Sequence, residues 1–180
     1  ENLNREWKQK IPVLLMNSFY THKDTQAHLN SLNFSSEIIG FQQNKFPRLH
    51  AGNLNPLTPE KWGDQTFYPP GHGDFFQCVS QQGILQRLID EGREILFMSN
   101  ADNLGAVMDP VILNYMDEFN IPFLMEMTPK TSADVKGGTL YQVDENSNYW
   151  KLLRFLMTKL TIFVIRISSK CLIPTISGST

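Results

Sequence analysis

Near the start of the chain, the spacing of apolar residues changes from strand-like to helix-like and back, which restricts the fold to one that holds a βαβ unit. Residues 11–17 form a short, nearly continuous apolar run, as expected for a parallel strand buried on both faces. Thr21 stands three residues before Asp24, a capping-box-like start for a helix over roughly residues 22–32. Residues 37–42 then predict a second strand, which completes the unit.

The rest of the chain continues the alternation and predicts an α/β fold. In chain order, the expected elements are a loop-rich excursion with short strands over 48–67, a helix from Asp74 to about Ile89 with a weak point at Gly83, a strand over 94–99, a helix after Pro110 and a strand over 121–128. Strands that alternate with helices in this way predict a parallel sheet wrapped by helices.

Composition narrows the class of protein. The 180 residues are 41% hydrophobic and 19% charged, enough for one domain or a piece of a larger one. A net charge of -2 offers no basic field for nucleic acid. Cys78 and Cys171 lie far apart and form neither a CxxC metal site nor a disulfide framework, which indicates a reducing, cytoplasmic compartment. The polar first residues do not resemble a signal peptide, and the missing initiator Met suggests a chain cut from something longer.

Residues 68–74 (Tyr-Pro-Pro-Gly-His-Gly-Asp) place a glycine turn directly before a predicted helix. Gly71 and Gly73 would let the backbone approach a planar base or a phosphate, and free amides at a helix start favour an anion. His72 would then donate to a phosphate or sugar oxygen. In an arbitrary protein such a run is more often a tight turn with a surface histidine, so both interpretations stay open on these residues alone.

Residues 100–103 (Asn-Ala-Asp-Asn) follow the strand predicted over 94–99, where open α/β sheets bind ligands. The Asp102 carboxylate suits Mg²⁺, which prefers oxygen ligands and shares them with phosphates, and the Asn100 amide suits a sugar hydroxyl. An Asx-rich turn explains the four residues equally well. The position after a strand favours the ligand site.

A third motif covers residues 126–140 and ends in a Gly137-Gly138 pair. Backbone amides at the two glycines would touch sugar hydroxyls, while Lys130 or Lys136 would neutralise phosphate. On this segment alone, a solvated loop with incidental lysines is the favoured interpretation.

Together, residues 12–143 resemble the UTP–glucose-1-phosphate uridylyltransferase family. Besides the three motifs, residues 41–48 (Phe-Gln-Gln-Asn-Lys-Phe-Pro-Arg) are similar to a Phe-x-Gln-x-x-Tyr/Phe-Pro-Arg segment of that family. The resemblance implies an incomplete Rossmann-like, three-layer α/β/α mixed sheet of the nucleotide-diphospho-sugar transferase type. It also implies a Mg²⁺-dependent reaction of UTP with glucose 1-phosphate to give UDP-glucose and pyrophosphate, without a covalent protein nucleophile.

The same resemblance implies ligand contacts from six residues, namely Gln43, Gly71, His72, Asn100, Asp102 and Gly138. Gln43 and Gly71 would read the uracil, while His72 and Asn100 would contact the phosphates or the glucose. Asp102 would help to hold Mg²⁺, and Gly138 would lie against the sugar. Catalytic residues are not assigned, because the family's Gly-rich nucleotide loop and its later lysine are not found in the sequence.

These gaps leave several functions open. The chain is expected to be an inactive fragment of the enzyme, with residues 1–145 a partial catalytic domain. A non-catalytic UDP-sugar-binding module is one alternative, and a uridylyltransferase for another hexose 1-phosphate, such as N-acetylglucosamine 1-phosphate, is a second. A product that folds poorly is a third. No nucleic-acid or membrane partner is expected, and the sequence assigns no oligomeric state.

Residues 146–180 depart from the family and are expected to be a frameshifted or mis-spliced tail. Lys and Arg interrupt its apolar residues, so a membrane-spanning helix is not expected. The mixed helix and strand period over 152–167 predicts either a makeshift helix or a strand at an exposed edge. A chain that ends near Val143 is therefore expected to be more soluble than all 180 residues.

Overall fold

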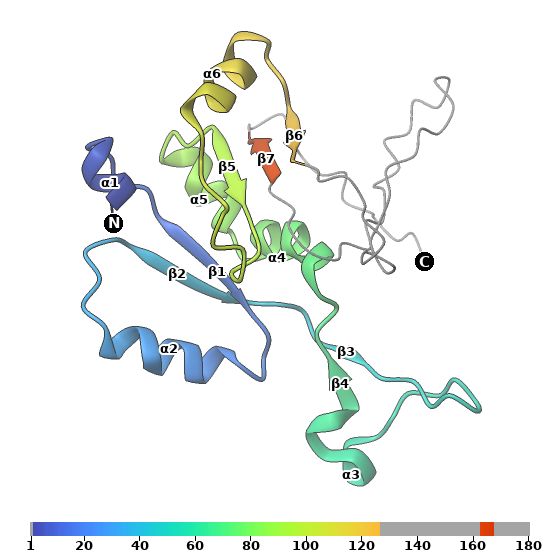
Figure 1. Ribbon diagram of the computed structural model, residues 1–180. Helices are drawn as coiled ribbons and strands as arrows, with labels where there is room; N and C mark the ends of the chain where they lie inside the picture. Colours follow the sequence, from blue (N-terminus) through green and yellow to red (C-terminus); the bar gives the residue numbers. More distant parts are fainter. Residues whose placement is uncertain (1, 127–162, 168–180) are drawn as a thin grey trace, which may run out of the picture. The chain divides into compact units, whose positions relative to one another are not determined.

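The computed structural model describes residues 2–126 and 163–167 of the chain (Figure 1). These residues fall into two compact units, Glu1–Ile84 and Leu85–Thr180. Each unit is described by itself.

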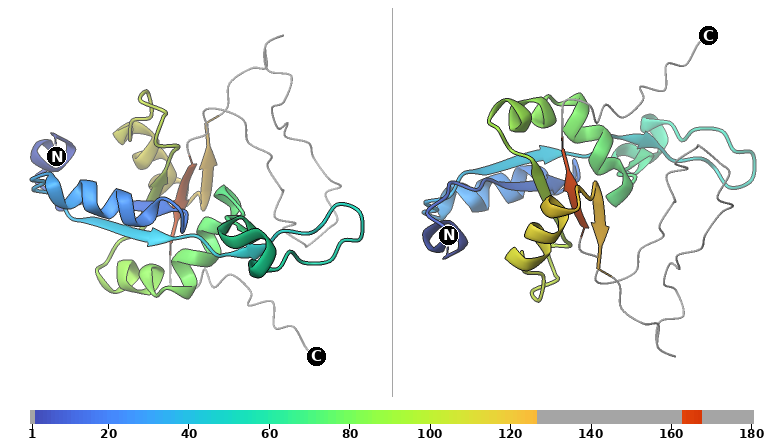
Figure 2. Two further views of the ribbon diagram at one scale, coloured as in Figure 1. Left: turned by 90° about the horizontal axis from the view of Figure 1, so that it is seen from below. Right: turned by 90° about the horizontal axis from the view of Figure 1, so that it is seen from above.

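The first unit opens with the predicted βαβ arrangement. A short helix α1 (Asn2–Glu6) precedes β1 (Val13–Asn17), α2 (His22–Ser31) and β2 (Ile38–Gln42). The two strands are parallel, and α2 lies along one face of the pair (Figures 1 and 2). The βαβ prediction is confirmed.

The predicted burial of the first strand on both faces is wrong for the described residues. No residue of β1 is fully buried, and Val13 is exposed. The reason is that β2 is the only hydrogen-bonded neighbour of β1 among the described strands, and α2 lies on one face only.

Helix α2 does not begin with the predicted capping box. Thr21 has a helical backbone (φ −102°, ψ −16°), and its side chain makes no capping hydrogen bond. Ser18 supplies the acceptors for the amides at the start of the helix instead. Its carbonyl accepts from the His22 amide at 2.9 Å, and its hydroxyl accepts from the Thr21 amide at 3.2 Å. A capping side chain reaches the first-turn amides from an extended backbone, which Thr21 lacks.

The excursion predicted over residues 48–67 contains short helices rather than short strands. It connects β3 (Phe46–Pro47) to its antiparallel partner β4 (Phe67–Tyr68). Between them lie α3 (Pro59–Trp62) and the 3₁₀ turn η1 (Gly63–Thr66), with one isolated bridge between Leu49 and Pro56 among the described residues. Proline at the start of α3 has no amide to leave unpaired, which favours a helix there.

The helix predicted over residues 74–89 is divided in two. A 3₁₀ turn η2 (His72–Asp74) leads into α4 (Phe75–Gln81), and α5 (Ile84–Asp90) follows. Gly83 separates them with φ +73°, a left-handed conformation that ends a helix. The predicted weak point is thus a complete break.

The second unit begins within α5 and holds a three-stranded sheet and a further helix (Figure 1). Its other elements are β5 (Ile95–Met98), α6 (Pro110–Glu118), β6 (Phe123–Met125) and β7 (Phe163–Arg166). Pro110 begins α6 as predicted, and the Asp109 carboxylate caps it by accepting from the Val111 amide at 2.8 Å.

Strand β7 lies in the middle of this sheet, between β5 and β6 and antiparallel to both. Val164 is aligned with Phe97 on one side and Leu124 on the other, and it is 3% exposed. With the fully buried Met116 of α6 it forms the core of this unit. Arg166 secures the strand to α6, since its guanidinium donates to the Met116 carbonyl at 3.2 Å and to the Asp117 carboxylate at 3.0 Å.

The prediction of an exposed edge strand in the tail is therefore wrong for Phe163–Arg166, because β5 and β6 supply a partner on each side. The parallel sheet predicted from the alternation of strands and helices is not found in this unit, since β7 is antiparallel to both of its neighbours. Parallel pairing is confirmed for β1 and β2. The remaining tail residues of the prediction lie outside the described residues.

The described elements mix helices with parallel and antiparallel strands, so the α/β class is confirmed. Within residues 2–126 and 163–167, no helix is long and apolar enough to cross a membrane.

Candidate functional site

Gln43 and Gly71, two of the predicted uracil contacts, meet in the structure. Gln43 follows β2 directly, and its amide donates to the Asn17 carbonyl at the end of β1 at 2.8 Å. Its side-chain oxygen Oε1 accepts from the Gly71 amide at 2.8 Å. The loop after β2 and the glycine turn before α4 are therefore joined by the side chain that the sequence assigned to the base.

A second contact joins the same two segments, between Asn44 and Asp74. The Asp74 carboxylate is buried, with 8% of the residue exposed. Its Oδ2 accepts from the Asn44 backbone amide at 2.6 Å, and its Oδ1 accepts from the Asn44 side-chain amide at 2.8 Å. Hydrogen bonds to a carboxylate are stronger than those between neutral groups, so this contact holds residue 44 firmly.

Cys78 lies one helical turn beyond Asp74 and is fully buried. Its thiol donates to Asp74 Oδ2, with the sulfur 3.0 Å from the oxygen. Burial, and then the hydrogen bond and the negative charge of Asp74, raise the pKa of the Cys78 thiol to about 11. The thiol thus remains protonated at neutral pH and acts as a donor rather than as a nucleophile.

Gly71 has a backbone that other residues rarely adopt, with φ 98° and ψ −160°. A Cβ built on Gly71 would meet no described atom within 4 Å, so the space beside it is open. His72 follows with an exposed side chain that makes no hydrogen bond to the described residues. An open glycine face and an available imidazole are suited to contact with a ligand.

The predicted anion site at the helix start is not supported by the geometry. The Gly71 amide already donates to Gln43, and the first negative charge at the start of α4 is the chain's own Asp74. A carboxylate there interacts favourably with the helix dipole and competes with a phosphate for the same position.

In the second unit, Asn100 and Asp102 lie in a loop that follows β5, as predicted. Successive turns shape it, because the Asn103 amide donates to the Asn100 carbonyl and the Leu104 amide donates to the Asp102 carbonyl, each at 3.1 Å. The Asp102 side chain is exposed and accepts no hydrogen bond from the described residues. Asn103 differs, since its Nδ2 is buried without a hydrogen-bond partner in the described part of the chain.

A single exposed carboxylate fits Mg²⁺ only when a ligand completes the coordination. Among the described residues there is no group of three or more His, Cys, Asp or Glu side chains that could hold a metal ion. Mg²⁺ is commonly held by one or two carboxylates together with substrate phosphates, and Asp102 meets that requirement. Gly138 and the rest of the third motif from residue 127 onward lie outside the described residues.

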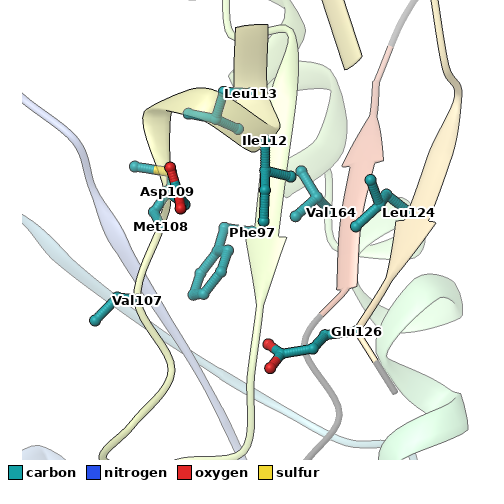
Figure 3. A pocket seen from close by; sticks show the side chains of 9 residues that line it. All are labelled: Phe97, Val107, Met108, Asp109, Ile112, Leu113, Leu124, Glu126 and Val164. Carbon is teal, nitrogen blue, oxygen red and sulfur yellow. The ribbon is translucent and has the colours of Figure 1, made fainter. Parts of the chain in front are cut away.

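The second unit also contains an apolar hollow of about 300 Å³, including space open to solvent (Figure 3). Phe97 of β5, Leu124 of β6, Val164 of β7 and Ile112 of α6 line it, and the Glu126 carboxylate lies at one end (Figure 3). None of the predicted ligand contacts in the described residues lines this hollow. Its charged lining residues are Asp109 and Glu126, and two carboxylates between apolar walls do not suit the phosphates of a nucleotide sugar.

Sequence reasoning missed Asn44, Asp74 and Cys78. Each sits next to a predicted site residue or one turn beyond it, but no spacing rule connects residue 44 with residue 74. A polar Asp at the start of an otherwise apolar helix was the available signal, but it was interpreted only as the first residue of that helix. In the structure it makes no capping hydrogen bond.

Comparison with known proteins shows the family of the chain. The family model described as UTP--glucose-1-phosphate uridylyltransferase matches residues 1–155. This match runs past residue 145, where the sequence predicted the divergent tail to begin.

Among curated relatives, a UTP--glucose-1-phosphate uridylyltransferase 2 of Dictyostelium discoideum is 42% identical over 165 residues, which are 91% of this chain and 33% of that protein. The Saccharomyces cerevisiae UTP--glucose-1-phosphate uridylyltransferase is 47% identical over 146 residues, 80% of this chain and 29% of the relative. The chain thus spans about a third of the length of the curated relatives it matches.

Solved structures show the same similarity. A Trypanosoma brucei UDP-glucose phosphorylase matches with a TM-score of 0.68 and 36% identity, over 76% of this chain and 30% of that one. A variant of the Leishmania major UDP-glucose pyrophosphorylase, solved in complex with UDP-glucose, matches with a TM-score of 0.66 and 33% identity over the same shares. With a family match over most of its residues, the chain belongs to the UTP–glucose-1-phosphate uridylyltransferase family.

Proposed function

We propose that this chain supplies the base-reading and sugar-phosphate loops of an enzyme that forms UDP-glucose and pyrophosphate from UTP and glucose 1-phosphate. The family match over residues 1–155 carries the proposal. The hydrogen bond between Gln43 and Gly71 supports it, because it holds side by side the two loops that are expected to bind the uracil.

Gln43 has a defined task in this proposal. Its Oε1 accepts from Gly71, so its Nε2 is the group left to donate to a ligand. Uracil presents carbonyl oxygens, which accept such a hydrogen bond, next to the open face of Gly71. His72 and Asn100 donate to the phosphates or glucose hydroxyls, and Gly138 lies against the sugar.

Asp102 is the proposed Mg²⁺ ligand in the second unit. When bound, Mg²⁺ neutralises charge on the phosphates while they are displaced. The exposed Asp102 carboxylate suits this role, because it is not already committed to another described residue.

The fold belonging to this function is the incomplete Rossmann-like, three-layer nucleotide-diphospho-sugar transferase type. The parallel β1–β2 pair with α2 on one face supports it. A cytoplasmic location is proposed from the buried, reduced Cys78.

A non-catalytic UDP-sugar-binding module is the second candidate. The observation in its favour is that the chain spans about a third of the length of its relatives. Such a module would keep the loops around Gln43 without turning substrate over.

Calorimetric titration of the 180-residue chain tests the shared part of both functions. We expect UDP-glucose to bind, and UDP-N-acetylglucosamine and GDP-glucose to bind more weakly. GDP-glucose is the control for the base, and UDP-N-acetylglucosamine tests the alternative hexose. Equal affinity for UDP-glucose and GDP-glucose, or no heat with either, would contradict a uracil site on this chain.

A further inference from the structure

The loop after β2 and the turn before α4 are closed into one ring by hydrogen bonds. Gly71 donates its amide to Gln43 Oε1 at 2.8 Å, and its carbonyl accepts from the Asp74 amide at 3.1 Å. The Asp74 carboxylate accepts from Asn44, which is covalently joined to Gln43. Every connection around the ring is therefore either a hydrogen bond or the chain itself.

We propose that Asp74 is a positioning residue that sets the orientation of the Gln43 side-chain amide toward a uracil base. The inference rests on the proposed function, in which Gln43 is the residue that reads the base. Asp74 does not touch the base in this proposal, because it is buried beneath the turn.

The selection of the base depends on which group of the Gln43 side-chain amide, the oxygen or the NH₂ group, faces the ligand. A glutamine that is free to rotate about its last bond offers either its oxygen or its NH₂ group, and so accepts uracil and cytosine about equally. With Gly71 donating to Oε1, Gln43 presents Nε2 to the ligand. If Nε2 faces position 4 of the base, it donates to uracil O4 but meets the 4-amino group of cytosine, so the ring selects a uridine nucleotide.

Asp74 suits this task better than a neutral residue would. Its carboxylate accepts three donors at once, from the Asn44 backbone, the Asn44 side chain and the Cys78 thiol. An amide in its place offers one neutral oxygen, and its NH₂ group meets the Asn44 NH₂ group unless Asn44 turns its side-chain amide over. Either outcome weakens the hold on residue 44 and so on Gln43, because a neutral oxygen accepts more weakly than a carboxylate and a buried donor without an acceptor costs more still.

The test compares the unaltered 180-residue chain with D74N, with the exchanged pair N44D/D74N and with T66V. In the exchanged pair, the amide at position 74 can donate to the carboxylate at position 44 and still accept from the backbone, and the net charge is unchanged. T66V is the matched control, because Thr66 is buried in the same unit and donates to Gly63 at 2.6 Å, outside the ring.

Two readouts are measured on each variant. The first is hydrogen exchange of the Gly71 amide without ligand, by NMR. The second is the ratio of affinities for UDP-glucose and CDP-glucose, by calorimetry. For D74N we expect faster Gly71 exchange, UDP-glucose binding weaker by about tenfold, as for the loss of one net hydrogen bond, and a smaller UDP-to-CDP ratio.

The exchanged pair should recover both readouts, whereas T66V should lower the melting temperature and leave both unchanged. If D74N does not fold, N44A keeps the backbone bond from residue 44 to Asp74 and removes the side-chain bonds to Asp74 and to the Cys78 sulfur. It should shift both readouts in the same direction by a smaller factor. Unchanged Gly71 exchange and an unchanged ratio in D74N or N44A would overturn the positioning role. If the unaltered chain binds neither nucleotide sugar, the proposed function fails, and Gly71 exchange alone decides whether Asp74 holds the ring.

Discussion

At the scale of one residue, the backbone conformation at position 71 decides which amino acid can stand there. Its φ of 98° and ψ of −160° belong to a region that is nearly exclusive to glycine, although space for a side chain is open. We expect G71A to destabilise the chain by about 1–3 kcal/mol through backbone strain alone. Thermal unfolding measures this. G73A is the control, because Gly73 has equal space without a positive φ, and an equal loss in both variants would contradict strain as the cause.

The Cys78 thiol yields a second residue-scale prediction. In a C171S background Cys78 is the only thiol, and its pKa of about 11 leaves little thiolate at pH 8. We expect iodoacetamide to label it at least roughly 100-fold more slowly in the folded chain than in urea. Because the folded pKa lies above the ordinary value of 9.0, the stabilisation is complete below pH 9 and is lost as pH rises through about 11. Labelling at the same rate in both states would show that the Cys78 thiol is not buried against Asp74 in the folded chain.

Asp102 is the residue on which the Mg²⁺ proposal depends. In D102N a neutral amide replaces the carboxylate, and an amide is a poorer ligand for a hard cation. We expect Mg²⁺ to strengthen UDP-glucose binding to the unaltered chain and to lose most of that effect in D102N. Calorimetric titrations with Mg²⁺ and with EDTA measure it. D64N, at another exposed aspartate, should behave like the unaltered chain, and an intact Mg²⁺ effect in D102N would assign the ion to other ligands.

At the scale of an element, β7 decides whether the second unit has a core. Its Val164 is 3% exposed and pairs with strands on both sides, so removal of β7 takes away the neighbour that β5 and β6 share among the described strands. We now expect a chain ending at Val143 to be less soluble than the full 180 residues, the reverse of the expectation from sequence.

V164D tests the same element without truncation, because it places an unpaired carboxylate in that core. Soluble yield and the unfolding midpoint in urea should both fall. V111D is the matched control, since Val111 on α6 is 73% exposed and an acidic residue is tolerated near a helix start. Unchanged stability of V164D, or a more soluble truncated chain, would show that β7 adds nothing to the fold.

At the scale of the whole molecule, the chain spans about a third of the length of its relatives. The resemblance implies a Gly-rich nucleotide loop and a later lysine, and neither is found in the 180 residues. The loss of one contact that stabilises the transition state typically lowers the rate roughly 10²–10³-fold. With more than one such contact missing, we expect no measurable UDP-glucose synthesis by the 180-residue chain. Pyrophosphate release from UTP and glucose 1-phosphate measures this. The Saccharomyces cerevisiae relative assayed alongside is the positive control, and release at a comparable rate from the purified chain would overturn the expectation.

The sequence by itself determined the βαβ unit, the glycine turn and the membership of a family. These depend on local chemistry: the period of the apolar residues in β1, α2 and β2, and a glycine where only glycine tolerates the backbone. Features that depend on residues close together in the chain can be predicted from the sequence. The weak point at Gly83 was predicted for the same reason.

Only the tertiary structure decided which distant groups meet. Asn44 and Asp74 are thirty residues apart, and their hydrogen bonds exist because the end of β2 lies against the start of α4. Strand β7 pairs with β5 across more than sixty residues, and a mixed apolar period does not specify whether such a segment lies at an edge or between two strands. Long-range pairing depends on which backbone groups and apolar faces still lack a partner after the local elements have formed. A single sequence does not show which groups these are.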